Sequence, residues 1–371
     1  MVQYAYDDSA VVIAVPAGWQ AEDVEVTRTM EHVAIPLRRL PAHVSIREVG
    51  PRDGLQNEDI ILTTDQKVRL IDCLSTTGFQ FIEVGAFVHP RRVPQMADTA
   101  EVFARIARRP GVVYSAIAPN ATGAQRAVAA GADAVQVFLS ASESHNRSNV
   151  NMSIAESLAQ AAEIAAIVTG AGRMFDAVIS VAFGCPFEGD VPIARVLDLS
   201  AKLLDLGAAQ ITLGDTTGMG HPRLVQELAL AFRARFPRAQ LRLHLHSARG
   251  AGLANVLAAL EVGVDRFDAS AGGIGGCPFA PGAPGNICSE DLIHLLHEMG
   301  IETGVDLPAL LACVRELEAL LGHAIPSQTL KAGICKHLSA DGSPRLSERV
   351  ISDECHDDAM MPQRPDDTVV R

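Results

Sequence analysis

The chain has 371 residues, of which 48% are hydrophobic and 20% are charged, and its formal net charge is -13. These fractions are typical of a globular protein, and the length fits two ordinary domains or one large α/β barrel. The acidic balance argues against a nucleic-acid partner and against binding to anionic membranes, because both require a basic surface. No apolar run has the length needed to cross a membrane.

Cysteine usage and the acidic N-terminal segment bear on the cellular compartment. The seven cysteines are odd in number and contain no CxxC pair, and they are Cys73, Cys185, Cys277, Cys288, Cys313, Cys335 and Cys355. This pattern predicts reduced thiols rather than a disulfide framework or a zinc knuckle. The N-terminal segment lacks the pattern of a signal or transit peptide. We therefore expect a cytoplasmic protein.

Short apolar runs alternate with longer amphipathic segments from about residue 44 to residue 300. Eight runs are strand-like, and they cover residues 44–49, 79–87, 112–118, 134–140, 177–183, 209–214, 241–246 and 265–270. Eight β-then-α units in this length predict a (β/α)8 TIM barrel. The alternative is a doubly wound open sheet, which needs a glycine fingerprint after its first strand. The segment GPRDGLQNE lacks the GxGxxG spacing, so the barrel is preferred.

Capping signals and composition divide the chain further. Thr63 with Gln66, and Ser153 with Glu156, have capping-box spacing before amphipathic segments. Glycines stand where three helices should end, at Gly78, Gly170 and Gly300. We expect three regions, which are an N-terminal extension over 1–43 with a short strand at 10–15, a barrel domain over 44–338 that includes a helix at 306–322 and a short further segment, and a disordered tail over 339–371.

The run LRLHLH at 241–246 places two histidines on one face of a strand. His244 and His246 could therefore converge on one metal ion. For an HxH in an arbitrary strand, a hydrogen-bonded pair of histidines is the more common explanation. The end of the seventh strand of a barrel reverses that preference, because functional groups gather at the carboxyl ends of barrel strands.

Arg52 and Asp53 follow the first predicted strand, in a segment that alone reads as an ordinary turn. Glu83 lies within the apolar second strand, where a carboxylate is costly unless it is paired. Because the two strands are neighbours in a barrel, Arg52 is the natural partner of Glu83. Such a pair fixes the direction of the guanidinium, as a catalytic site requires.

Polar groups also follow the fourth, fifth and sixth predicted strands. Asp215 is either a helix cap or a site residue. Arg147 lies in SASESHNRSN, where the pattern does not separate ligand contact from solvation of a loop. Cys185 is more typical of a small buried residue than of a reactive thiol.

The stretch GGIGGCPFAPGAPGN at 272–286 contains six glycines and three prolines, which exclude a helix or the middle of a sheet. It predicts a loop of defined shape around Cys277. Asn286 at its end can supply an oxygen ligand to a hard cation. With Asp53, His244 and His246 it gives a mixed O/N donor set that favours Mg²⁺ or Mn²⁺ over structural zinc.

Together these segments resemble the hydroxymethylglutaryl-CoA lyase family of metal-dependent TIM-barrel lyases, over roughly residues 44–335. The resemblance rests on six stretches in the same order, which are EVGPRDGLQNE, FIEVGAFVHPRRVPQMAD, GCPFEGD, LGDTTGMG, HLHSARGAGLANVLAAL and GGIGGCPFAPGAPGNICSEDL. It implies that Mg²⁺ or Mn²⁺ is held by Asp53, His244, His246 and Asn286. It further implies catalytic roles for Arg52, Glu83, Asp215, His244 and Cys277.

The resemblance also implies retro-Claisen cleavage of a tertiary 3-hydroxy-acyl-CoA to acetyl-CoA and a keto acid such as acetoacetate. The acyl-CoA would be contacted by Arg52, Gln56, Ser142, Arg147 and Arg249. Ser247 and Arg249 depart from the HDTYG of the best-known members, and Asp59 stands where lysine is common. Citramalyl-CoA or another 3-hydroxy-3-methyl acyl-CoA is therefore an alternative substrate to hydroxymethylglutaryl-CoA.

Two other functions compete with the lyase. Condensing enzymes of the isopropylmalate or homocitrate synthase type share the barrel, the arginine and the HxH site, but they lack the cysteine loop and usually carry a sizeable C-terminal regulatory domain. A catalytically silent binding protein is disfavoured by the complete set of metal, arginine and cysteine positions. We expect a homo-oligomer, most simply a dimer, and the helix at 306–321 could pack across its interface.

Overall fold

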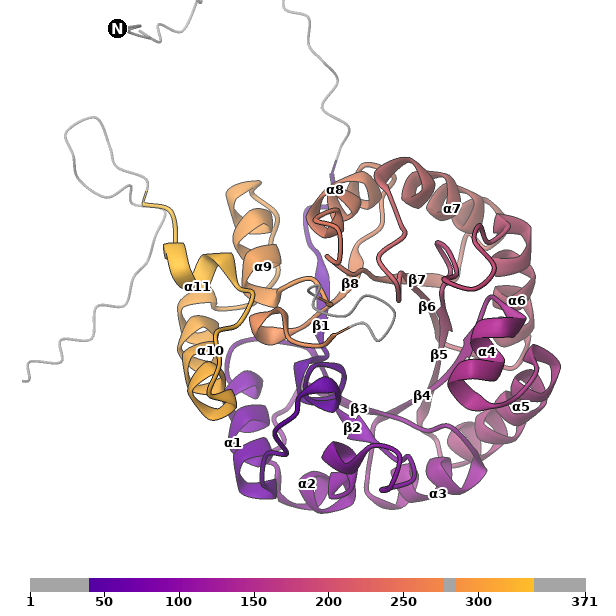
Figure 1. The fold of residues 1–371 in the computed structure, drawn as a ribbon, viewed down its shortest axis with the longest axis horizontal. Helices are drawn as coiled ribbons and strands as arrows, with labels where there is room; N and C mark the ends of the chain where they lie inside the picture. Colours follow the sequence, from indigo (N-terminus) through magenta and orange to yellow (C-terminus); the bar gives the residue numbers. More distant parts are fainter. Residues whose placement is uncertain (1–39, 277–284, 337–371) are drawn as a thin grey trace, which may run out of the picture.

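A closed barrel of eight parallel strands forms the centre of the computed structural model, which describes residues 40–276 and 285–336 (Figure 1). The strands follow one another round the barrel in chain order, and β1 closes it by pairing with β8. They are β1 (Ser45–Glu48), β2 (Phe81–Ala86), β3 (Val113–Ile117), β4 (Ala134–Ser140), β5 (Met174–Ser180), β6 (Gln210–Gly214), β7 (Gln240–His244) and β8 (Arg266–Ala269). The predicted TIM barrel is confirmed, whereas the predicted strand at 10–15 and the tail at 339–371 lie outside the described residues.

Helices surround the barrel, and two more extend the chain beyond it (Figure 1). The surrounding helices are α1 (Thr64–Ser75), α2 (Thr99–Arg105), α3 (Ala121–Ala129), α4 (Glu143–Val150), α5 (Ile154–Gly170), α6 (Ile193–Asp205), α7 (Pro222–Arg235), α8 (Gly252–Glu261) and α9 (Ser289–Glu298). The additional helices are α10 (Leu307–Leu321) and α11 (Gln328–Ala332), as the sequence predicts for this segment. None of the helices in the described part of the chain is long and apolar enough to span a membrane.

The predicted helix starts are correct, and one predicted strand is displaced. Thr63 and Ser153 both close reciprocal capping boxes, at the starts of α1 and α5. The strand predicted at 177–183 is wrong by three residues, because β5 covers Met174–Ser180. Val181 and Phe183 are buried in the turn that follows β5, and Val181 has a φ of 51°. Apolar composition alone does not separate a buried turn from a buried strand.

Side chains along each strand alternate between the helix layer and the inside of the barrel. On β7, the buried Leu241 and Leu243 alternate with Arg242 and His244. Arg242 is fully buried, and it donates to Gln210 at 3.1 Å and to the Phe267 carbonyl at 2.7 Å. The barrel therefore encloses buried charged groups, and these continue upward into polar residues at the carboxyl ends of the strands.

A disulfide joins α1 to α10, which lies beside it on the outside of the barrel (Figure 1). It links Cys73 to Cys313 across 240 residues of sequence, with 6.0 Å between the two Cα atoms. The prediction that the cysteines are all reduced is therefore wrong for this pair. Sequence spacing could not reveal it, because a pairing between helices so far apart in the chain depends on the closed barrel.

Candidate active site and metal centre

A cavity of about 660 Å³ opens at the carboxyl end of the barrel strands. The last residues of five strands line it, namely Ala86, Ile117, Ser180, Gly214 and His244. Many of its polar lining residues are those that the sequence predicts for the site, namely Arg52, Asp53, Gln56, Glu83, His244 and His246. This is the end at which barrel enzymes place their active sites.

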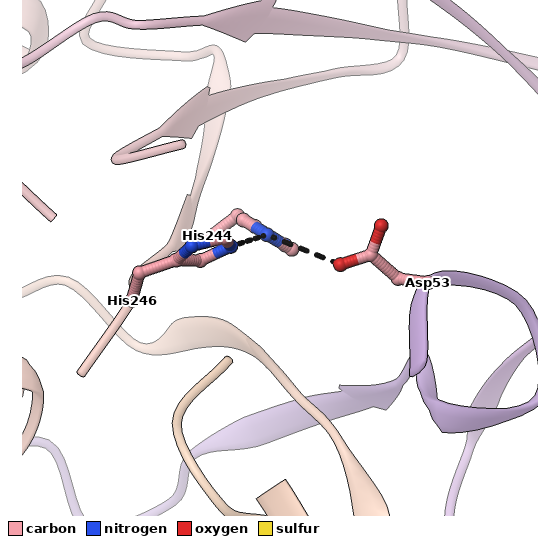
Figure 2. Close-up of side chains that lie close together, drawn as sticks. All are labelled: Asp53, His244 and His246. Carbon is pink, nitrogen blue, oxygen red and sulfur yellow. Dashed lines mark hydrogen bonds and ion pairs between the residues drawn. The ribbon is translucent and has the colours of Figure 1, made fainter. Parts of the chain in front are cut away.

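Asp53, His244 and His246 bring one ligand atom each to within 4.8 Å of one another (Figure 2). The Nε2 atoms of the two imidazoles lie 3.0 Å apart, and Nε2 of His244 lies 3.7 Å from a carboxylate oxygen of Asp53. Two imidazole nitrogens that face each other at this distance can direct their lone pairs at one cation when both are unprotonated. Nitrogen and carboxylate donors around one point suit a divalent cation, so the residues fit the predicted metal.

Asn286 completes the predicted donor set. Its amide nitrogen donates to Asp53 at 2.8 Å and to the carbonyl of Ile274 at 3.2 Å, which leaves its amide oxygen as the atom that could ligate. Its backbone also pairs with that of His246 in an isolated bridge. The fold therefore brings all four predicted ligands together from three separate segments of the chain.

Arg52 lies in the tight helical turn over Gly50–Gly54 that follows β1. Its Nε donates to Glu83 on β2, and its Nη1 donates to Asp53 at 2.6 Å. The second oxygen of Glu83 accepts from the amide of Gln136 on β4. The predicted ion pair between Arg52 and Glu83 is confirmed. It fixes the guanidinium at the wall of the cavity, beside the candidate metal site.

The charges of these groups follow from their neighbours. Burial opposes ionisation of Asp53, but Arg52 and then His244 outweigh it and lower the pKa of Asp53 to about 2. Burial and the charge of His244 lower the pKa of His246 to about 3. The site therefore presents an ionised carboxylate and a neutral imidazole near neutral pH, and both are the forms that bind metals.

Asp215 lies just beyond β6 but is not among the residues that line the cavity, whereas its neighbours Gly214 and Thr216 are. One of its carboxylate oxygens accepts from the N–H groups of Met219 and Gly220, both at 2.9 Å. Burial raises the pKa of Asp215, although these two hydrogen bonds oppose the shift. The geometry matches an orienting group that shapes the turn beside the site.

Three predicted substrate contacts also lie outside the residues that line the cavity, which do include Gln56. Ser142 is fully buried and caps α4, and its hydroxyl lies 2.9 Å from the thiol of Cys185. This buried position of Cys185 agrees with its predicted structural role. Arg147 lies on α4, and Arg249 donates to the carbonyls of Thr217 and Gly218 at 2.9 and 3.0 Å.

Cys277 lies outside the described residues, but the residues just before it lie against the candidate site. Gly276, the residue before it, lines the cavity. Gly275 has a φ of 105°, and a Cβ there would approach the amide of Asn286 to 2.6 Å and the carbonyl of Asp53 to 3.2 Å. Glycine at this position therefore lets the loop begin directly against two of the candidate ligands.

Two functional contacts escaped the sequence analysis. Asp268 on β8 lies 3.2 Å from Nδ1 of His244 and lines the cavity. Glu48, the last residue of β1, accepts from the N–H of Ala271 at 2.8 Å and of Gly50 at 2.7 Å. The available signal was the same as for Glu83, since both carboxylates lie within short apolar strands and must find partners there.

Comparisons with known proteins agree with this geometry. The model of the HMGL-like family matches residues 43–316. The hydroxymethylglutaryl-CoA lyase YngG of Bacillus subtilis is 44% identical over 291 residues, which are 78% of this chain and 97% of that protein. The 3-hydroxy-3-isohexenylglutaryl-CoA/hydroxymethylglutaryl-CoA lyase of Pseudomonas aeruginosa is 42% identical over 80% of this chain and 99% of its own.

A solved structure extends the similarity to three dimensions. It is that of an HMG-CoA lyase from Acinetobacter baumannii in complex with coenzyme A and 3-methylmalate. It is 47% identical, covers 80% of this chain and 97% of its own, and has a TM-score of 0.77. The family match, the two relatives and this structure all span the barrel and its site. The chain therefore belongs to the HMGL-like family, that of the hydroxymethylglutaryl-CoA lyases.

Proposed function

We propose that this protein is a divalent-metal-dependent carbon–carbon lyase that cleaves hydroxymethylglutaryl-CoA to acetyl-CoA and acetoacetate. The observation that carries the proposal is the placement of two groups in one cavity. Asp53, His244 and His246 converge on one point, and the clamped guanidinium of Arg52 lies beside them. Relatives at 42–44% identity over most of the chain bear the name of this lyase.

The reaction balances as a retro-Claisen cleavage. The 3-hydroxyl group loses its proton, and its oxygen becomes the ketone oxygen of acetoacetate as the C–C bond breaks. The electron pair of that bond passes to the thioester fragment as an enolate. A proton added to the enolate carbon then completes acetyl-CoA. A bound Mg²⁺ or Mn²⁺ would act as a Lewis acid, since it acidifies a hydroxyl and polarises a carbonyl that coordinate to it.

The residues of this chain would supply the rest. Asp53, His244, His246 and Asn286 would hold the cation. Arg52 would donate hydrogen bonds to the thioester oxygen, where negative charge develops in the enolate. Glu83 would keep the guanidinium in that direction, since it accepts from Nε and leaves other N–H groups for the substrate. Asp215 would orient the turn next to His244. Its carboxylate accepts from two N–H groups of that turn, and its backbone N–H donates to the His244 carbonyl at 2.8 Å.

Cys277 would deliver or relay the proton that quenches the enolate. Its loop starts at Gly276 on the cavity wall, close to the candidate ligands. A thiol carried by this loop would reach the reacting carbon at the open side of the barrel. The loop would also exclude bulk water, which would otherwise compete for the enolate.

A second substrate deserves a test because of the cavity wall. Its apolar residues include Val88, Val93, Ile117, Phe138 and Val178. One relative bears the name of a lyase for the larger 3-hydroxy-3-isohexenylglutaryl-CoA as well as for hydroxymethylglutaryl-CoA. An apolar wall could accept a longer 3-alkyl group. Citramalyl-CoA, whose acyl chain is shorter than that of hydroxymethylglutaryl-CoA, is the smaller alternative substrate.

Gln56 on the cavity wall would contact the acyl-CoA, and Ser142, Arg147 and Arg249 would shape the loops around it. We place the protein in the cytoplasm as a homodimer. We further propose that it binds neither nucleic acid nor anionic membranes, which its net charge of -13 disfavours. Size-exclusion chromatography with light scattering tests the dimer directly.

The decisive experiment is a cleavage assay with purified full-length protein. It would contain Mg²⁺ or Mn²⁺ and, in separate reactions, hydroxymethylglutaryl-CoA, citramalyl-CoA and 3-hydroxy-3-isohexenylglutaryl-CoA. We expect acetyl-CoA and acetoacetate from the first substrate, in equal amounts. A higher kcat/KM with another substrate would reassign the substrate and keep the lyase. Failure to cleave any of the three with either metal would overturn the lyase.

A further inference from the structure

The carboxylate of Asp268 touches His244 from the side opposite to the candidate metal. Asp268 comes from β8 and His244 from β7, and these two residues pair directly in the sheet register. Nδ1 of His244 lies 3.2 Å from Oδ2 of Asp268, while Nε2 of His244 faces His246 and Asp53 (Figure 2). Asp268 is only 3% exposed, so this contact is made in the interior of the barrel.

A buried arginine fixes Asp268 in turn. Nε of Arg47 donates to Oδ1 of Asp268 at 2.9 Å, and Nη2 of Arg47 donates to Oδ2 at 2.8 Å. This is the two-pronged geometry in which a guanidinium holds a carboxylate most rigidly. Arg47 is 2% exposed, and its Nη2 also donates to Thr212 on β6 at 3.2 Å. Arg47 of β1 therefore fixes the aspartate, and Thr212 of β6 helps to fix Arg47.

The consequence for His244 concerns which ring nitrogen carries hydrogen. An imidazole that donates Nδ1–H to a carboxylate keeps the lone pair on Nε2. The imidazole also loses the freedom to rotate about its Cβ–Cγ bond, since the carboxylate that accepts from Nδ1 fixes the plane of the ring. Both effects prepare His244 as a metal ligand, and such outer contacts typically change metal affinity by about 10- to 100-fold.

We infer that Asp268 and Arg47 are positioning residues of the metal centre, which act through His244 and do not themselves touch the cation. The inference rests on the proposed metal site. It assigns a purpose to the buried charges inside the barrel that neither the motifs nor the cavity chemistry require. It also predicts that metal affinity depends on an arginine on the far side of two intervening side chains.

Asp176 offers a matched control. It is a buried carboxylate on β5 in the same barrel interior, and its Oδ2 lies 3.8 Å from Nη1 of Arg47. Unlike Asp268, it has no contact with a histidine among the described hydrogen bonds and ion pairs. Asp176→Asn therefore removes a buried carboxylate from the same interior but leaves the two hydrogen bonds from Arg47 to Asp268 and the contact of Asp268 with His244 in place.

The test is isothermal titration calorimetry of metal-free full-length protein with Mn²⁺. A separate thermal-unfolding curve first establishes that each variant is folded. We expect Asp268→Asn to weaken Mn²⁺ binding about 10- to 100-fold and Asp176→Asn to leave it unchanged. Raising Mn²⁺ should restore most of the kcat of Asp268→Asn in the cleavage assay. Arg47→Lys should weaken binding less than Asp268→Asn, and it carries the test if Asp268→Asn does not fold.

His244→Ala separates the two ways of failing. If the wild type binds Mn²⁺ and His244→Ala does not, the metal site stands. Unchanged affinity in Asp268→Asn would then overturn this inference alone, as would an equal loss in Asp176→Asn. If the wild type binds no Mn²⁺, the proposed metal site fails and the inference fails with it.

Discussion

Glu48 at the end of β1 accepts a hydrogen bond at 2.8 Å from the N–H of Ala271, the residue that begins the short turn after β8. The same carboxylate accepts from the N–H of Gly50 and from the hydroxyl of Ser289. One buried side chain thus joins the turn that carries Arg52 to the start of the loop that carries Cys277. Its ionisation should influence how firmly these two segments, which carry the proposed catalytic residues, are held.

We expect the stability contribution of Glu48 to depend on pH. Burial raises the pKa of Glu48 from 4.5 to about 7, although its three hydrogen bonds oppose the shift. The folded state therefore holds this proton more tightly than the unfolded state does. The resulting stabilisation is complete below pH about 4.5, falls as the pH rises to about 7 and is absent above it. The change is on the order of 3 kcal/mol.

Urea unfolding of the wild type and of Glu48→Gln between pH 5 and pH 8 measures this effect. Glutamine mimics the protonated acid, so the wild type should lose stability relative to the variant as the pH rises. A difference that stays constant across this range would show that the pKa of Glu48 is not raised.

The ion pair between Arg52 and Glu83 predicts graded losses of activity. Arg52→Lys keeps the charge but loses the planar fork, and kcat should fall about 100- to 1000-fold, as for the loss of one donor to a developing oxyanion. Glu83→Gln keeps Arg52 but weakens the bond that directs its guanidinium, so the fall in kcat should be smaller. Arg69→Lys, at an exposed ion pair on α1, serves as the control in steady-state assays. Equal activity of Arg52→Lys and the control would remove Arg52 from catalysis.

Removal of the metal should lower both activity and stability. Dialysis against EDTA should abolish cleavage, and either Mg²⁺ or Mn²⁺ should restore it. A cation at 100 times its Kd adds about 2.7 kcal/mol to the free energy of unfolding, provided that it binds the folded state alone. Differential scanning calorimetry should therefore show a higher Tm with metal for the wild type and no shift for His244→Ala. A shift of the same size in that variant would place the cation elsewhere.

Cys277→Ser tests the proton donor apart from binding. A hydroxyl is a much weaker acid than a thiol, so kcat should fall at least about 100-fold, the lower end for general acid–base catalysis. The affinity for Mn²⁺ should not change, because Cys277 is not among the proposed ligands. Cys288→Ser, at a buried thiol that starts α9, is the control. Loss of Mn²⁺ binding in Cys277→Ser would indicate damage to the metal centre instead.

Counting thiols before and after reduction tests the disulfide between Cys73 and Cys313. In concentrated urea, reduction should expose two more thiols to a colorimetric reagent than the unreduced protein shows. Cys313→Ser should remove that difference and lower the free energy of unfolding by about 2–4 kcal/mol, the usual range for a native disulfide. Cys335→Ser, at an exposed free cysteine, should do neither. Equal thiol counts before and after reduction would show that the two cysteines are not bonded.

Much of the site could be predicted because its residues signal their constraints locally. Glu83 in an apolar strand needed a cation, and Arg52 was the nearest one at a neighbouring strand end. His244 and His246 share a face by strand periodicity alone. Asp268 carries the same signal as Glu83, but its partner was harder to identify, since Arg47 lies 221 residues earlier and meets it only when β1 closes the barrel against β8. Ser142 and Arg249 look like ligand contacts in sequence, but the structure uses their polar atoms to hold loops together.

The donors of the proposed metal centre also come from both sides of the seam at which the barrel closes. Asp53 follows β1, His244 ends β7, and Asn286 lies between β8 and α9. A chain emerging from the ribosome has no complete set of donors until its first and last strands have met, because Asp53 lies on one side of the seam and the other three proposed ligands lie on the other. Cation binding can therefore stabilise only the completed ring. It should act late in folding, as a lock on the finished barrel rather than as a nucleus for it.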